Sequence, residues 1–593
     1  MAEYQAPLDD MNFVISEHLD GSGLASLPGC EDFSSELAES ILAEANKLAS
    51  NVLSPLNWVG DQTGVTVSGD AEVKTPKGFK EAYQQYAEGG WGSLQFSTDH
   101  GGQGLPFALA IPVQEMWHSA NMAWGLCPLL TQGAIEALEA SASDELKEKY
   151  MPNMIAGTWT GTMNLTEPQS GSDMATLKSK AEREGDHYRI KGQKIFITWG
   201  EHDMVENIIH LVLARLPDAP DGVKGISLFL VPKYLVNDDG SLGERNDLKV
   251  VSTEHKLGAH ASPTCVMSFG DEEGAIGYLV GEEHQGLACM FKMMNNARLT
   301  VGLQGVSISE RAYQLARDYA NERIQGIAPG KSDFGPIIHH PDVRRMLLTM
   351  RSMTEASRAL AYVACSSVDF RNKAEDESLR ALHESRSALL TPVVKGWTTE
   401  IAQEITSIGV QVHGGMGFIE EAGAAQHYRD ARILPIYEGT NGIQAADLVG
   451  RKTQGDGGRA MDALLKDMRQ TIDAANKAGA ELSALAKNVA AAVDALEQAK
   501  VDLLAVSQDD DCYAGSVSYN YLMMTGYVCG AWQMLHAATI AAQRSADSNN
   551  PFYDQKAHTS AFYINNILPR YLSYAAIIKA GSSTTMAMEA GDF

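Results

Sequence analysis

Apolar residues recur at the spacing of an α-helix over most of the chain. From about residue 34 to 158, Ser34 gives a cap-like start, and the apolar residues that follow return every three or four positions. A glycine-rich break at 100–106 separates the helices of this region. Helical spacing resumes over 291–451, with an interruption around 327–330. These two regions are predicted to be helical domains.

Between the helical regions, residues 159–290 have the pattern of short strands and turns. Residues 188–190 and 192–198 predict a β-hairpin, and the apolar runs 208–213 and 226–231 predict two further strands. We therefore expect a β module inserted between two helical domains.

Helical spacing returns once more after a polar, glycine-rich stretch at 452–458, which is typical of a hinge or linker. Met461, Leu464 and Met468 begin this last region, and alanine is enriched beyond them, which favours helix. The chain is therefore predicted to be an α+β protein. Its expected parts are an N-terminal extension (1–33), an N-terminal helical domain (34–158), a middle β domain (159–290), a helical bundle domain (291–451) and an additional C-terminal helical domain (452–593).

The chain is strongly acidic, with 47 Lys and Arg against 75 Asp and Glu, a formal net charge of -28 over 593 residues. Such a surface repels phosphate backbones and anionic lipids, so neither nucleic acid nor a membrane is an expected partner. No apolar run approaches the roughly 20 residues of a membrane span, and no basic-apolar leader is seen at the start. A cytoplasmic location is therefore expected.

Cysteine and histidine give no sign of a metal or disulfide site. The seven cysteines are scattered and never form a Cys-x-x-Cys pair, so reduced, mostly buried thiols are expected. Histidines are likewise dispersed, and we expect structural roles for them and no metal site. The histidines considered are His100, His118, His202, His255 and His260.

Two short motifs carry the chemistry: Asn-Leu-Thr-Glu-Pro-Gln-Ser-Gly-Ser-Asp at 164–173 and Ile-Tyr-Glu-Gly-Thr-Asn-Gly-Ile-Gln at 436–444. Alone, the second is typical of a turn followed by a helix start. Together, in this order, they resemble the acyl-CoA dehydrogenase family, over about residues 35–451. The resemblance implies an acyl-CoA dehydrogenase-like fold with a β-barrel-like middle domain, FAD as cofactor, an acyl-CoA substrate, an electron-transferring flavoprotein as acceptor, and a homodimer or dimer of dimers.

The resemblance implies that Glu438 is the catalytic base. Dehydrogenation of a thioester needs a carboxylate over Cα, a flavin behind Cβ, and hydrogen-bond donors on the thioester carbonyl, where negative charge develops. Some relatives place the base before the arginine of an earlier helix. That position is Ala297 here, which cannot take a proton.

The same resemblance implies the remaining site residues. Two of these residues also have a purely structural interpretation. Arg298 could be an ion-pair partner within the fold, and Phe196 could be a core residue of a strand. The implied FAD contacts are Met163, Leu165 and Thr166 at the ring, Ser172 at the pyrophosphate, Phe196 and Thr198 against the flavin, Gln411 and Gly415 from a neighbouring subunit, Arg323 at the adenine end, and Thr440. The implied substrate contacts are Arg298, Tyr437 and Gly439. Either the acyl pocket or ordinary core is expected at Gln114, Trp117, Met122 and Trp124.

The region after Arg451 favours a long branch of the family, and the start at 4–13 favours a bacterial branch acting on a short, sulfur-containing acyl-CoA. A branch for very long chains at membranes is disfavoured because no basic amphipathic stretch is present. Three alternatives stay open: a broad-range fatty acyl-CoA dehydrogenase, an acyl-CoA oxidase, and a DNA-associated member of the fold. The charge of -28 opposes the last.

Overall fold

The computed structural model describes residues 4–19, 23–69 and 71–593. The chain packs as two compact units, each described here by itself. The helical unit comprises Met1–Glu44, Pro106–Glu115 and Arg298–Phe593, and the sheet unit comprises Ala45–Leu105 and Met116–Ala297.

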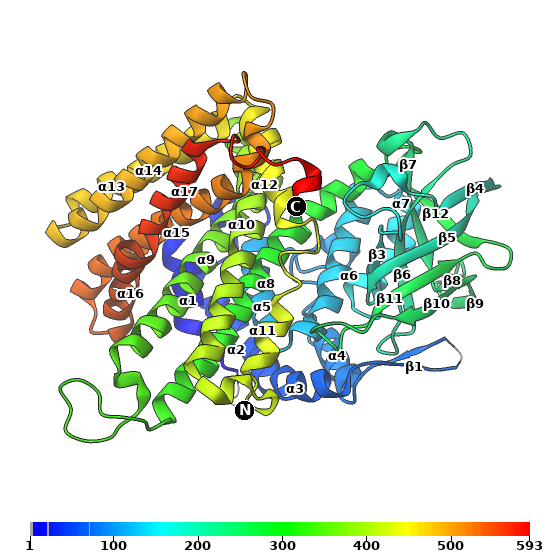
Figure 1. The fold of residues 1–593 in the computed structure, drawn as a ribbon. Coiled ribbons are helices and arrows are strands. Elements are labelled where there is room, and N and C mark those ends of the chain that lie inside the picture. The colour runs from blue at the N-terminus through cyan, green and yellow to red at the C-terminus, as the bar shows by residue number, and fades with distance from the viewer. Residues whose placement is uncertain (1–3, 20–22, 70) are drawn as a thin grey trace. The chain divides into compact units, whose positions relative to one another are not determined.

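The sheet unit contains an eight-stranded sheet in the order β10-β11-β5-β12-β7-β6-β3, with β4 paired to β5 and β6 (Figure 1). The predicted strands 208–213 and 226–231 are confirmed as parts of β6 and β7, which pair antiparallel. The strands are β3 (Trp159–Asn164), β4 (Lys180–Glu184), β5 (His187–Thr198), β6 (Asn207–Arg215), β7 (Ile226–Pro232), β10 (Leu248–Thr253), β11 (Thr264–Phe269) and β12 (Ala275–Val280). Two small sheets pair β1 (Thr66–Val67) with β2 (Val73–Lys74) and β8 (Tyr234–Val236) with β9 (Leu242–Arg245).

The hairpin predicted over 188–198 is wrong, because β5 runs through this segment as one strand and pairs with β4 instead. Gly192 lies inside β5, where it allows a close approach to a neighbouring segment. A Cβ there would lie 2.3 Å from the Ser179 Oγ, so the strand passes its neighbour where only glycine fits.

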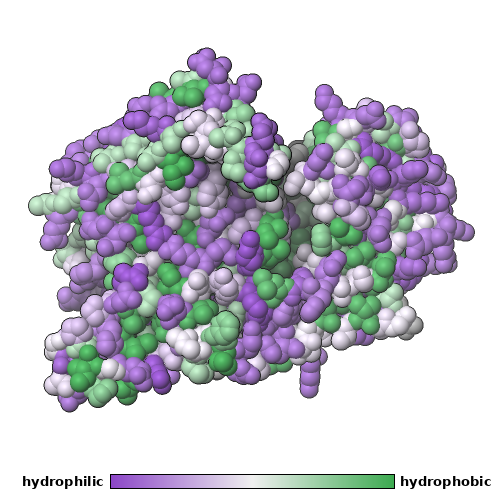
Figure 2. Space-filling view, viewed as in Figure 1, coloured by the Kyte–Doolittle hydropathy of each residue, from purple (hydrophilic) through white to green (hydrophobic). Residues whose placement is uncertain are grey.

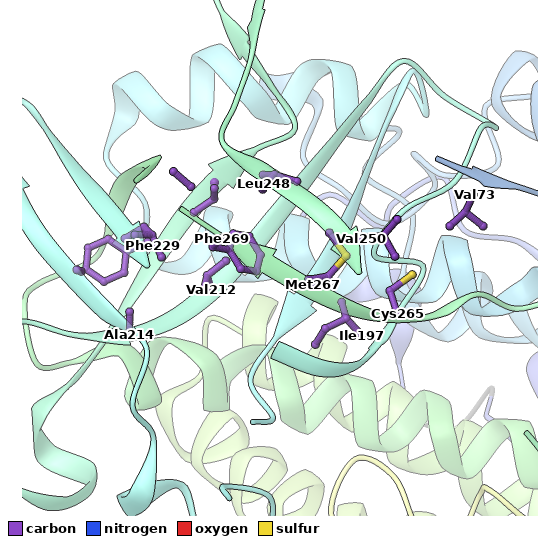
Figure 3. Close-up of a cluster of buried hydrophobic side chains, with 14 residues drawn as sticks. Val73, Ile197, Val212, Ala214, Phe229, Leu248, Val250, Cys265, Met267 and Phe269 are labelled. Atoms are coloured by element: carbon purple, nitrogen blue, oxygen red, sulfur yellow. The ribbon is translucent and has the colours of Figure 1, made fainter. Parts of the chain in front are cut away.

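The strands enclose a hydrophobic core of side chains such as Val212, Phe229 and Met267 (Figure 3). Complete burial of one such side chain stabilises a fold by about 1.5–3 kcal/mol. Ile190 and Ile197 bind β5 to this core, each no more than 2% exposed. The core therefore fixes the strand on which the predicted flavin contacts Phe196 and Thr198 lie.

Several α-helices lie wholly within the sheet unit, and two helices of the first 120 residues contribute residues to both units. The first group is α3 (Ser54–Thr63), α4 (Phe79–Glu88), α6 (Met122–Ser141) and α7 (Asp144–Ile155). The second is α2 (Ser35–Leu48) and α5 (Phe107–Ala120). The cap predicted at Ser34 is confirmed, because its Oγ accepts a hydrogen bond from the Leu37 N–H at 3.2 Å.

In the helical unit, the long helices α9 and α10 pack together, and α15 packs on both (Figure 1). A Cβ at Gly526 of α15 would lie 2.1 Å from Cγ of Trp397 in α10, so the two helices approach closely. The helices are α8 (Gly286–Glu322, from Arg298 in this unit), α9 (Pro341–Lys373), α10 (Glu377–Val412), α11 (Ala424–Ala431), α12 (Asn441–Ala446), α13 (Arg459–Lys477), α14 (Ala480–Val506), α15 (Tyr513–Asp547), α16 (Pro551–Phe562) and α17 (Tyr571–Ala580). The predicted C-terminal helices are thus confirmed.

The predicted linker at 452–458 is shorter than expected, because the π-helix η11 (Asp447–Gln454) continues into it. Thr453 is fully buried, and its Oγ1 donates to the Leu448 carbonyl at 2.9 Å. Only the residues before α13 form the turn, where Gly457 and Gly458 have positive φ. This short connection is ordered by packing.

A buried ionic cluster holds the N-terminal segment in the helical unit. Arg358 of α9 is fully buried, and its guanidinium donates to Asp10 at 2.6 Å, Glu115 at 2.7 Å and Glu310 at 2.8 Å. Tyr362 also donates to Glu115, at 2.7 Å. The cluster joins α1 (Leu8–Asn12) to α5, α8 and α9.

Polar residues predominate on the face drawn in Figure 2, with hydrophobic residues in separate patches. All seven cysteines are free, and all except Cys512 are buried. No helix in the described part of the chain is long and apolar enough to cross a membrane.

Candidate active site

Glu438 lies in a strained turn of the helical unit, directly before α12. Its φ is 54°, and that of Gly439 is 82°, so two consecutive residues occupy the left-handed region. For a residue with a side chain this conformation costs about 1–2 kcal/mol. Such strain persists only where surrounding contacts impose it, and it is concentrated at functional sites.

Hydrogen bonds on both sides of the turn hold it in place. The Gln444 Nε2 donates to the carbonyl oxygens of Glu438 and Gly439, each at 3.3 Å. The Thr440 Oγ1 caps α12 by accepting from the Ile443 N–H at 3.3 Å. The side chain of Glu438 is consequently carried on a fixed backbone at the start of a helix.

Glu438 is half-buried, and burial raises its pKa, opposed by the positive charges of Arg298 and Lys395. Arg298 is 4% exposed, and its Nη1 lies 3.9 Å from the Asp447 Oδ2. Beside Glu438, the Tyr437 hydroxyl donates to the Gln304 Oε1. The site therefore holds a carboxylate of raised pKa next to two buried cations, an arrangement suited to general base chemistry.

The predicted flavin contacts in the sheet unit share a geometry that suits a planar ring. Phe196 is 58% exposed and has φ of 60°, so β5 presents this aromatic side chain outward in a strained conformation. Thr166 and Thr198 are half-buried, as is Leu165, whereas Met163 is buried at the end of β3. An exposed aromatic ring beside partly accessible hydroxyls fits a flavin, which needs an apolar face and hydrogen-bond donors.

Glu167 fastens the loop that carries these residues. It accepts hydrogen bonds from the Lys194 Nζ at 2.8 Å, the Ser179 Oγ at 2.6 Å and the Lys178 N–H at 2.7 Å. Burial raises the pKa of Glu167, but the charge of Lys194 and these hydrogen bonds lower it to about 2. Because the pKa of Glu167 is depressed, its ionised form stabilises the folded loop fully above the ordinary glutamate pKa. This stabilisation is lost as the pH falls toward 2.

We expect Glu167→Gln to weaken FAD binding before it affects chemistry. The amide cannot accept all three hydrogen bonds and leaves Lys194 buried without its counterion, so the loop at 164–173 loosens. Titration of the apoprotein with FAD, followed by flavin fluorescence, measures the change. Glu182→Gln, at an exposed position of β4, is the control, and equal FAD affinity in both variants would remove the loop from the cofactor site.

The other predicted residues are placed as follows. Ser172 is exposed on the loop after β3, and Arg323, Gln411 and Gly415 are exposed in the helical unit. Trp117 and Trp124 pack with Tyr86 in the core of the sheet unit and are at most 2% exposed, as ordinary core residues are. Gln114 and Met122 are also buried.

Lys395 is a site residue that the sequence analysis missed. It is the single charged residue in the run 387–399, and it is fully buried beside the Glu438 turn. A lone lysine within an apolar helical run is a recognisable signal, because buried lysines need specific partners.

Family models match most of the chain. They are the acyl-CoA dehydrogenase N-terminal domain (residues 63–158), the middle domain (162–271), the C-terminal domain (284–452), and an acetyl-CoA dehydrogenase C-terminal-like domain (464–589).

Individual proteins are similar over nearly the whole chain. The 3-methylmercaptopropionyl-CoA dehydrogenase of Ruegeria pomeroyi is 46% identical, covering 95% of this chain and 96% of its own. A butyryl-CoA dehydrogenase of Syntrophomonas wolfei is 35% identical, covering 99% and 98%. The structure of Caenorhabditis elegans ACDH-11 with C11-CoA has a TM-score of 0.77 at 19% identity, covering 99% and 96%, which shows the fold.

Proposed function

The chain belongs to the acyl-CoA dehydrogenase family of FAD-dependent oxidoreductases, and on that premise we propose that it dehydrogenates 3-methylmercaptopropionyl-CoA to methylthioacryloyl-CoA. The single observation that carries the substrate class is the 46% identity, over 95% of the chain, to the Ruegeria enzyme of that name. The butyryl-CoA dehydrogenase at 35% identity supports a short, straight acyl chain.

Glu438 is the proposed base. Its carboxylate takes the proton from Cα of the thioester, and the raised pKa brings the strength of the base closer to that of the acid it deprotonates. Bound FAD would supply the acceptor for the hydride that leaves Cβ. The backbone N–H of Glu438 is the proposed donor to the thioester carbonyl, where charge accumulates. Tyr437, Gly439 and Arg298 are the proposed substrate contacts, and the burial of Arg298 favours an electrostatic role near the reacting atoms over contact with exposed CoA phosphates.

We propose two sets of FAD contacts, one of them contributed by a neighbouring subunit. In the sheet unit, the outward position of Phe196 supports its assignment to the flavin. The exposed positions of Gln411 and Gly415 support their assignment to FAD from a neighbouring subunit, and that of Arg323 supports its assignment to the adenine end of FAD. The complete proposed set is Met163, Leu165, Thr166, Ser172, Phe196, Thr198, Arg323, Gln411, Gly415 and Thr440. We further propose a cytoplasmic enzyme that passes electrons to an electron-transferring flavoprotein.

A panel of acyl-CoAs tests the substrate proposal. We expect 3-methylmercaptopropionyl-CoA and butyryl-CoA to reduce the flavin under anaerobic conditions with the highest kcat/KM in a series that extends to long chains. A maximum at long chains would instead favour a broad-range fatty acyl-CoA dehydrogenase. Hydrogen peroxide formed in step with turnover in air would identify an oxidase.

A further inference from the structure

Lys395 of α10 contacts the strained turn directly. Its side chain is fully buried, and its Nζ donates to the Gly439 carbonyl and to the Asn441 Oδ1, both at 2.8 Å. One hydrogen bond thus acts on the residue that follows Glu438, and the other on the first residue of α12.

Asn441 extends the same attachment. Its Nδ2 donates to the Gly396 carbonyl at 3.1 Å, the Thr399 Oγ1 at 2.9 Å and the Glu400 Oε1 at 2.9 Å. All three acceptors lie on α10, within five residues of Lys395. Lys395 and Asn441 therefore attach the backbone around Glu438 to one short, mostly buried stretch of α10.

The positive charge of Lys395 acts on Glu438, whose pKa it lowers. Among the described residues no carboxylate lies within ion-pair distance of the Lys395 Nζ, which bonds to neutral oxygens instead. Burial lowers the pKa of Lys395 to about 7, opposed by Glu438 and Glu400 and reinforced by Arg298. The charged groups around the turn are Arg298 of α8, Lys395 and Glu400 of α10, and Asp447 and Arg451 of η11, with Tyr437 as a titratable neighbour.

We propose that Lys395 is a positioning residue for the base: it fixes the left-handed turn through Gly439, and its positive charge favours the ionised form of Glu438. This inference rests on the proposed role of Glu438. The hydrogen bond to the turn and the positive charge can be tested separately, because a neutral donor at position 395 can still hydrogen-bond to the turn but carries no charge.

The sign of the charge effect follows from electrostatics. Removing a nearby cation raises the pKa of a carboxylate, so the base becomes ionised only at higher pH. The acid limb of the pH profile for flavin reduction should therefore move to higher pH in Lys395→Met. A shift of about one pKa unit lowers the rate about tenfold on the acid side, and the rate recovers as the pH rises.

The experiment compares Lys395→Met, Lys395→Gln and the control Lys500→Met in the FAD-loaded full chain. Lys500 is a buried lysine of α14 whose Nζ pairs with Asp462 of α13. Stopped-flow flavin reduction by 3-methylmercaptopropionyl-CoA gives the pH profile, and hydrogen–deuterium exchange gives the protection of amides 436–444.

We expect Lys395→Met to shift the acid limb and speed exchange at 436–444. Lys395→Gln should shift the limb with a smaller change in exchange, and Lys500→Met should change neither. An unshifted limb in both Lys395 variants, or exchange in Lys395→Met equal to wild type, would overturn the proposal. Should no acyl-CoA reduce the wild-type flavin, the proposed function fails, and the exchange comparison alone then decides whether Lys395 holds the turn.

Discussion

Glu438→Gln is expected to bind FAD and acyl-CoA almost normally and yet fail to reduce the flavin. Glutamine nearly preserves the size of the side chain and leaves the backbone N–H in place, so the change removes the base alone. A general base contributes ~10²–10⁴-fold to a rate, and the loss here should be at least of this size because proton and hydride departure are coupled. Anaerobic stopped flow at saturating acyl-CoA measures it.

Glu167→Gln serves as the matched carboxylate control. It should lose flavin affinity, but once saturated with FAD it should keep most of the rate of flavin reduction. If Glu438→Gln retained flavin reduction within about threefold of wild type, far less than a general base contributes, Glu438 would not be the base.

Arg358→Met should destabilise the helical unit strongly. The substitution removes the cation shared by Asp10, Glu115 and Glu310 and leaves three buried carboxylates without it. Breaking a buried ion pair by removing one partner costs about 3–5 kcal/mol. We expect a clearly lower midpoint in denaturant unfolding.

Arg345→Met is the matched control in the same helix. The Arg345 Nε also pairs with a carboxylate, Asp342 at 2.8 Å, but its side chain is 57% exposed. Such a surface pair is worth about 0–1 kcal/mol. Equal unfolding midpoints for the two variants would show that the buried cluster does not anchor the fold.

Much of the fold could be predicted because periodicity is a local signal. The helix capped by Ser34 and the strands around Ile208 and Ile226 follow from apolar spacing alone. The predicted hairpin at 188–198 was wrong because the sequence does not distinguish a glycine in a turn from a glycine that lets two segments of the chain pack closely. Only the three-dimensional position of Ser179 distinguishes the two for Gly192.

The candidate site was predictable where a motif carries it, and not where it depends on distant partners. The motif at 436–444 contains Glu438 and Gln444, which meet across a single turn. Lys395 lies over forty residues earlier, and nothing near it in the sequence indicates that its Nζ reaches the Gly439 carbonyl. Likewise, the exposure of Phe196 depends on a positive φ that the apolar alternation of a strand does not reveal.

Deuteration of the substrate at Cα tests the central claim most directly, since it concerns the bond that Glu438 is proposed to break. Wild-type enzyme loaded with FAD is mixed anaerobically with 3-methylmercaptopropionyl-CoA carrying hydrogen or deuterium at Cα, and the loss of flavin absorbance is followed. We expect rapid reduction in wild type, markedly slowed by deuterium, and virtually none in Glu438→Gln. Reduction that is insensitive to deuterium at Cα and persists in Glu438→Gln would contradict the central claim.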